Sequence, residues 1–312
     1  MTALLADPIF REHLRGRQHP ECPGRFDAVV RGLESAGLVH GLLPLDSRPA
    51  TEEELLLCHT PGYLATARSD VERGHAYLST GDTDITRNSW DVAARAAGGV
   101  LNAVDAVVQG RARNAFCAVR PPGHHASANR GMGFCIFNNV ALAARYAQRR
   151  HGIGRVLIVD WDVHHGNGTQ DIFYRDPSVF FFSTHQWPLY PGTGRADETG
   201  DDGGEGTTMN FPFPAGSGRA HILGAVQKYL APMMARFEPE LVLISAGFDS
   251  REGDLLGRFT LTDADFEDLT REIMTIADRS AAGKVVSLLE GGYALDGLAS
   301  AAAAHVKVLS RE

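Results

Sequence analysis

The stretch RVLIVDWDVHHGNG, residues 155–168, decides the fold prediction, because an apolar run passes directly into a polar cluster. The run VLIV is rich in β-branched residues and has no alternating polar positions. This pattern is typical of a strand buried on both faces of a parallel sheet. Two aspartates and two histidines follow within six residues. The stretch therefore predicts a core strand with a functional site at its carboxyl end.

Similar apolar runs recur along the chain, and helical patterns lie between several of them. The other predicted strands are AFCAV (115–119), VFFFST (179–184), TTMNFP (207–212), LVLISA (241–246) and KVVSLL (284–289). The predicted helices cover 89–108, 138–150, 220–237, 263–281 and 295–309. Such alternation favours an α/β fold, an open parallel sheet of about eight strands with helices on both faces. No linker or repeat interrupts it, so we expect a single domain over residues 1–312.

Unusual polar residues cluster just after five of these strands. RPPGHH follows AFCAV, DWDVHHGNG follows RVLIV, STHQW ends the VFFF run, SAGFDS ends LVLI, and EGGY follows VVSLL. Ligands of open parallel sheets bind beyond the carboxyl ends of the strands. The five clusters therefore predict one shared site.

The densest cluster has the composition of a metal site. In an extended segment Asp160, Asp162 and His164 would face the same way, and Asp249 supplies a third carboxylate from another strand. Neighbouring buried carboxylates are costly unless a cation neutralises them. An Asp–His–Asp set leaves a position open, as catalytic zinc requires, although such ligands also suit iron or manganese. A helix cap is the alternative role for Asp249 alone.

Other residues have the chemistry of proton transfer and substrate binding. His124 and His125 lie on a stiff loop formed by two prolines and a glycine, and histidine is the usual acid–base group near neutral pH. Tyr293 follows two glycines and could donate a hydrogen bond to an oxyanion. Aromatic residues on glycine-flanked loops could wall an apolar channel, with ordinary packing as the alternative: Phe134 beside Gly133, and Tyr190.

Charge and cysteine content narrow the choice of partner and compartment. The 30 Lys and Arg are outnumbered by 38 Asp and Glu, which argues against nucleic acid as a partner, since phosphate binding needs a basic face. Four scattered cysteines without a C-x-x-C pair are typical of a reduced, intracellular protein. With neither a signal-peptide pattern nor an apolar run long enough to span a membrane, we expect a cytoplasmic protein.

Seven blocks together resemble the histone deacetylase and acetylpolyamine amidohydrolase family, which has the arginase–deacetylase fold. They occur in the family's order over nearly the whole chain: HPECPGR (19–25), RPPGHHA (120–126), GFCIFNNVA (133–141), VDWDVHHGNGTQDIF (159–173), YPGTG (190–194), SAGFDS (245–250) and LEGGY (289–293).

The resemblance implies roles for individual residues. It implies one zinc ion held by Asp162, His164 and Asp249, with His125 as general base and then general acid and His124 as its electrostatic partner. Asp160 would orient His124. The family's second orienting carboxylate is replaced here by Asn167, as in the class II branch, which should lower the proton affinity of His125. A potassium ion near Asp160, Asp162, His164 and Ser183 is implied by similarity alone.

The resemblance also bears on the substrate. Some class II relatives that are poor at hydrolysing acetyl-lysine have histidine where Tyr293 stands, so the tyrosine predicts a competent zinc-dependent deacetylase. Polyamine-preferring relatives can place an acidic residue at or near the position of Leu256, and leucine there favours acyl-lysine peptides or proteins as substrates. The alternatives are an acetylpolyamine amidohydrolase, a two-manganese ureohydrolase and a non-catalytic acyl-lysine reader. The substrate, the acyl length and the oligomeric state are left open.

Overall fold

The computed structural model describes residues 1–311 and has one eight-stranded sheet in which every pairing is parallel. The strand order is β2-β1-β3-β8-β7-β4-β5-β6. The bounds are β1 Thr2–Leu5, β2 Leu43–Leu45, β3 Asn114–Cys117, β4 Val156–Asp160, β5 Val179–Gln186, β6 Thr208–Phe213, β7 Leu241–Ala246 and β8 Val285–Leu289. The open parallel sheet of eight strands predicted from the sequence is confirmed.

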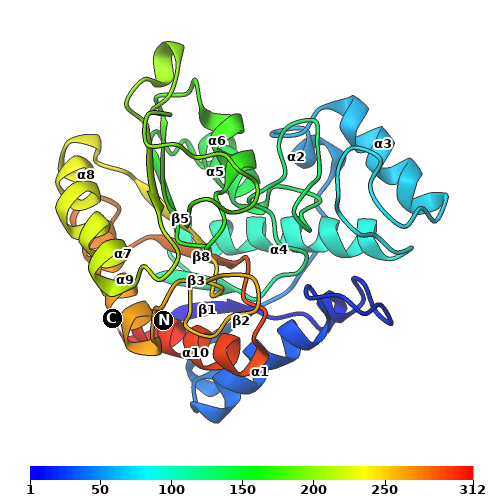
Figure 1. Cartoon of the computed structure of the whole chain (residues 1–312), viewed down its shortest axis with the longest axis horizontal. Helices are drawn as coiled ribbons and strands as arrows, with labels where there is room; N and C mark the ends of the chain where they lie inside the picture. The colour runs from blue at the N-terminus through cyan, green and yellow to red at the C-terminus, as the bar shows by residue number, and fades with distance from the viewer. Residues whose placement is uncertain (312) are drawn as a thin grey trace.

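Helices cover both faces of the sheet. The long ones are α1 Gly24–Ser35, α3 Pro61–Glu72, α4 Ser89–Val108, α5 Asn139–His151, α9 Asp263–Ser280 and α10 Leu295–Arg311, and the short ones are α2 Glu52–Leu55, α6 Asn167–Phe173, α7 Arg219–Ala225 and α8 Ala231–Phe237. Helices α1 and α10 lie side by side on one face with α9, whereas α4 and α5 pack together on the other (Figure 1). The two chain ends lie close together, and the Thr2 hydroxyl donates to the Leu309 carbonyl.

The sheet separates two apolar cores because successive strand residues point to opposite faces. On β4, for example, Ile158 packs into the core beneath α4 and α5, while Leu157 and Val159 pack into the core beneath α9 and α10. Both cores require apolar residues at consecutive strand positions. This explains the uninterrupted runs that the sequence shows.

The predicted helix over 220–237 is interrupted. The chain forms α7, then a π-helical turn over Val226–Leu230, and then α8. Pro232 near the start of α8 has no N–H to donate to the preceding turn, which favours the wider turn there.

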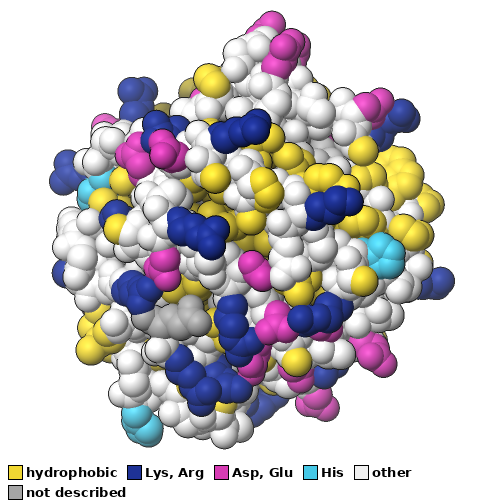
Figure 2. Space-filling model, turned by 90° about the vertical axis from the view of Figure 1, so that its left-hand side faces the viewer, with side chains coloured by type: hydrophobic (Ala, Val, Ile, Leu, Met, Phe, Trp, Pro, Cys, Tyr) yellow, Lys and Arg dark blue, Asp and Glu magenta, His cyan; other side chains and the backbone are white. Residues whose placement is uncertain are grey.

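The outer surface is mixed in character. Figure 2 views the molecule from the side on which α7, α8 and α9 lie, and Lys and Arg side chains are dispersed there among acidic and apolar ones. Within residues 1–311, no helix has both the length and the apolar character needed to cross a membrane.

Candidate active site

Five adjacent strands deliver the polar clusters to one edge of the sheet. In the order β3-β8-β7-β4, the carboxyl ends of four strands lead into the loops that hold His125, Tyr293, Asp249 and Asp162, and the adjacent β5 carries His185 near its own carboxyl end. These are the positions where an open parallel sheet binds ligands. The polar residues predicted to share a site therefore start from neighbouring strands.

Asp162, His164 and Asp249 converge in the interior at this edge. One ligand atom from each lies within 4.8 Å of the others, and all three residues are buried. The His164 Nδ1 atom is 3.0 Å from Asp162 Oδ1 and 3.2 Å from Asp249 Oδ2. Asp249 Oδ1 accepts the Val163 N–H at 2.9 Å. Asp249 Oδ2, also buried, makes no hydrogen bond within the described chain.

The three residues of this cluster strongly change one another's pKa values. Burial, reinforced by the charge of Asp162, raises the pKa of Asp249 to about 7. Burial opposes the charged form of His164, but the hydrogen bond to Asp162 and the negative charge of Asp249 outweigh it and raise the pKa of His164 to about 10. Two buried carboxylates with a free oxygen and one imidazole form a donor set that suits a divalent ion. The residues present therefore fit a zinc site.

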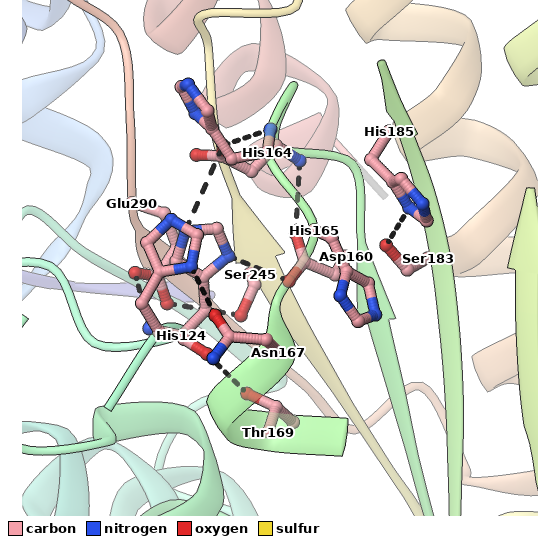
Figure 3. Close-up of polar contacts among 12 residues, drawn as sticks. His124, Asp160, His164, His165, Asn167, Thr169, Ser183, His185, Ser245 and Glu290 are labelled. Atoms are coloured by element: carbon pink, nitrogen blue, oxygen red, sulfur yellow. Dashed lines mark hydrogen bonds and ion pairs between the residues drawn. The ribbon is translucent and has the colours of Figure 1, made fainter. Parts of the chain in front are cut away.

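Asp160 faces a different partner from the one that strand geometry predicts. Strand β4 ends at Asp160, and residues 161–166 form an irregular loop, so the expected extended continuation through His164 is wrong. Asp160 Oδ1 accepts the Asp162 N–H and Oδ2 lies 2.9 Å from His124 Nδ1 (Figure 3). Asp162 Oδ1 accepts the His164 N–H in the same way. The side chains of Asp160 and Asp162 thus each accept a backbone N–H two residues further along the chain, which stabilises the irregular loop.

The two adjacent histidines have different partners. His124 contacts Asp160, whereas His125 Nδ1 lies 2.8 Å from Asn167 Oδ1. Burial opposes the charge of His124, but Asp160 and Asp162 outweigh it and raise its pKa well above the usual value. Burial lowers the pKa of His125 well below its usual value, and the charges of His124 and His164 lower it further. The pair therefore combines a cationic with a neutral imidazole.

Tyr293 follows β8 on a tightly anchored segment. Its N–H donates to Asp254 Oδ2 at 2.7 Å, and the Arg25 guanidinium lies over its ring at 4.9 Å. Burial raises the pKa of its phenol well above the usual value despite the opposing charge of Arg25. The hydroxyl thus stays protonated and able to donate a hydrogen bond.

A cavity of about 350 Å³ opens beside these groups. Its lining includes Asp82, His125, Gly133, Phe134, His164, Leu189, Tyr190, Leu256 and Tyr293. Gly133 has φ +57°, and a Cβ there would lie 2.3 Å from the His125 ring, so only glycine lets this wall approach the histidine. Every residue predicted for the channel lies on this one cavity.

Asp82 is a lining residue that the sequence did not reveal. Its Oδ1 accepts the Gly133 N–H at 2.8 Å, and the Tyr190 hydroxyl donates to its Oδ2 at 3.0 Å. Asp82 thereby connects both aromatic walls of the cavity. It lies in the irregular stretch 79–88, where neither periodicity nor spacing marks one acid among several.

The residues expected near potassium are also neighbours. Asp160 pairs with Ser183 in the register of β4 and β5, and the Ser183 hydroxyl lies 2.9 Å from His185 Nδ1. Both side chains already have partners within the protein, so the potassium site stays a prediction.

Comparisons with known proteins agree with this architecture. The sequence profile of the histone deacetylase domain matches residues 19–309. Histone deacetylase 10, chloroplastic, from Oryza sativa subsp. japonica is 40% identical over 301 residues, covering 91% of this chain and 68% of the relative. Polyamine deacetylase HDAC10 from Mus musculus is 42% identical over 301 residues, covering 93% of this chain but only 44% of the relative.

A solved structure shows the same fold. The crystal structure of the HDA15 HD domain superimposes with a TM-score of 0.92 at 39% sequence identity, covering 99% of this chain and 88% of that one. The arginase–deacetylase fold expected from the sequence is thereby confirmed. The chain belongs to the histone deacetylase family.

Proposed function

We propose that the protein is a zinc-dependent deacetylase, formed by one catalytic domain, that hydrolyses acyl-lysine side chains of peptides or proteins. One observation supports this more than any other. The buried Asp162–His164–Asp249 cluster lies beside a cavity that is also lined by His125 and Tyr293. A metal-binding set, a neutral base and a hydrogen-bond donor thus surround one space, which is the arrangement that amide hydrolysis requires.

Asp162, His164 and Asp249 would hold the zinc ion. When bound, zinc supplies Lewis-acid chemistry, polarising the amide carbonyl and making water a stronger acid.

The protein's own groups would then move the protons. Neutral His125, oriented by Asn167, takes a proton from the attacking water. The Tyr293 hydroxyl donates to the oxygen of the former carbonyl, where negative charge develops. His125 next gives its proton to the leaving amine as the C–N bond breaks. Cationic His124, held by Asp160, favours the developing negative charge. The products are a carboxylate and the free amine.

The cavity walls support an extended, mostly apolar substrate arm. Phe134 and Tyr190 offer aromatic surfaces, and Leu256 is neutral. The nearby acid Asp254 accepts the N–H groups of Leu256, Tyr293 and Ala294, so its carboxylate is engaged by the backbone. These contacts favour an acyl-lysine arm.

Deacetylation of polyamines is the second candidate, because polyamine deacetylase HDAC10 is among the similar proteins. A panel of acylated lysine peptides and acetylpolyamines, with zinc chelation as the control, tests both candidates. We expect chelator-sensitive hydrolysis with higher kcat/KM on acetyl-lysine peptides than on N-acetylputrescine. A higher kcat/KM on N-acetylputrescine would favour the polyamine deacetylase function. If zinc-replete protein hydrolysed neither substrate, the proposed function would be rejected.

Binding of zinc and potassium is also part of this proposal. Metal analysis should find one zinc ion per chain, a stoichiometry that further distinguishes a deacetylase from a two-metal ureohydrolase. A potassium ion beside Asp160 and Ser183 would be detected as dependence of activity on potassium at constant ionic strength.

A further inference from the structure

Glu290 is a buried acid in the active-site region that the proposed reaction does not use. It follows β8 directly and is 1% exposed. Its Oε2 accepts the backbone N–H groups of Gly123 at 2.6 Å and His124 at 3.1 Å. Its Oε1 accepts the Ser245 hydroxyl at 3.1 Å (Figure 3). The carboxylate at the end of β8 thus binds both β7 and the loop that carries His124 and His125, here called the histidine loop.

The histidine loop depends on this carboxylate for its hydrogen bonding. Within residues 1–311, the N–H groups of Gly123 and His124 have no acceptor other than Glu290. A buried N–H without an acceptor is strongly unfavourable. Removing the carboxylate therefore leaves two adjacent donors unsatisfied, immediately before His125.

Each of the residues 291–293, which follow Glu290, makes a hydrogen bond through its backbone. The Gly291 N–H donates to Asp162 Oδ2 at 2.8 Å. The Gly292 carbonyl accepts Arg25 Nε at 2.6 Å. The Tyr293 N–H donates to Asp254. This segment therefore contacts a proposed metal ligand and carries the proposed oxyanion donor, which makes it a rigid reference for the histidine loop.

We propose that Glu290 is a positioning residue, which fixes the His124–His125 loop relative to the segment that contacts Asp162 and carries Tyr293. The inference rests on the proposed deacetylase function for its catalytic consequence. The structural consequence, an ordered histidine loop, does not depend on catalysis.

The hydrogen bonds require an acceptor but no negative charge. In Glu290→Gln, the amide oxygen can accept from Gly123 and His124 while the amide nitrogen donates to the Ser245 oxygen. In Glu290→Ala, all three contacts are lost. The pair of variants therefore separates hydrogen bonding from charge.

Asp176 provides a control on the side of the sheet where the strands begin, just before the amino end of β5. Its carboxylate accepts both the backbone N–H and the hydroxyl of Ser178, at 2.8 and 2.6 Å, and its second oxygen forms an ion pair with Arg145. Asp176→Ala thus also removes an acceptor shared by a backbone N–H and a hydroxyl, away from the histidine loop.

The experiment combines hydrogen–deuterium exchange with kinetics on zinc-loaded protein. Exchange in peptides covering residues 119–126 should accelerate in Glu290→Ala but not in Glu290→Gln or Asp176→Ala. With an acetyl-lysine peptide, Glu290→Ala should lower kcat about 10²-fold with little change in KM, as expected for a misplaced acid–base group. The loss should be smaller with trifluoroacetyl-lysine, whose more electrophilic carbonyl needs less help from proton transfer. Glu290→Gln should stay within about threefold of wild type, since its hydrogen bonds remain.

Several results would overturn the inference. Unchanged exchange in Glu290→Ala would reject the structural role even if wild-type protein were inactive, which keeps this failure separate from that of the proposed function. Equal losses on both substrates would indicate a smaller active fraction and not a misplaced histidine. A Glu290→Gln variant as impaired as Glu290→Ala would show that charge, not acceptance of hydrogen bonds, is what matters.

Discussion

Replacing Asn167 with aspartate should shift the pH dependence of the enzyme toward alkaline pH. The Asn167 side-chain oxygen lies 2.8 Å from His125 Nδ1, and Asn167 is 8% exposed. The change adds a negative charge at almost constant shape, next to a histidine whose pKa is held well below its usual value by burial and by the charges of His124 and His164.

The size of the effect follows from the geometry. Two opposite charges about 4 Å apart attract by about 4 kcal/mol at an effective dielectric constant of about 20. Burial of the new carboxylate opposes part of this attraction. Carboxylates this close commonly move a partner's pKa by about 1–3 units, and each unit corresponds to about 1.4 kcal/mol. We therefore expect the pKa of His125 to rise by about 2 units.

The sign is fixed by the role of His125. Only neutral His125 can accept the proton of water, so a higher pKa lowers the active fraction at a given acidic pH. In kcat/KM measured against pH, the acidic limb of Asn167→Asp should lie about 2 pH units higher than in wild type. Asn167→Ser, which removes the partner without adding charge, should lower the plateau and leave that limb nearly in place. Coinciding acidic limbs in zinc-replete wild type and Asn167→Asp would refute the reasoning.

Three further predictions concern the oxyanion donor, the metal cluster and the channel wall. Tyr293→Phe should retain zinc but lower kcat about 10²–10³-fold, and wild-type turnover would exclude its role. Chelated protein should lose stability as pH rises through about 7 and then about 10, because the raised pKa values of Asp249 and His164 stabilise the fold only while these groups are protonated. Zinc affinity grows over the same range, so the Tm difference between loaded and chelated protein should widen with pH, and a constant difference would contradict this. Tyr190→Phe breaks the bond to Asp82 and should raise KM for acetyl-lysine peptides several-fold with little change in kcat, so an unchanged KM would argue against a fixed wall.

Much of the sheet could be predicted because its strands are buried on both faces. An uninterrupted apolar run such as LVLISA is typical of a strand that is covered on both faces, and β7 coincides with the predicted strand. Strand β1 and its neighbour, the edge strand β2, were missed, because Thr2–Leu5 and Leu43–Leu45 are too short to show a pattern. Helix α1 was also missed, since its partly polar sequence packs against α10, a contact distant in sequence.

The site was predictable in composition but not in local geometry. Alternation of side chains along a strand suggested that Asp160 joins the metal cluster, yet the strand stops there and Asp160 contacts His124. The roles of Asp82 and Glu290 depend on contacts with loops 51 and 167 residues away, which no local pattern reports. Glu290 could have been noticed as an acid directly after an apolar strand.

The two adjacent histidines show how one short loop can give identical side chains different chemistry. Strand β4 ends at Asp160 and α6 begins at Asn167. The six residues between them include Asp162 and His164, so the partners of both histidines flank two of the proposed metal ligands. A charged partner keeps His124 protonated and a neutral partner leaves His125 able to accept a proton, which is how environment separates acid and base roles. Because the ends of this loop belong to a core strand and a helix, these two elements set the spacing between the proposed metal ligands and the partners of both histidines.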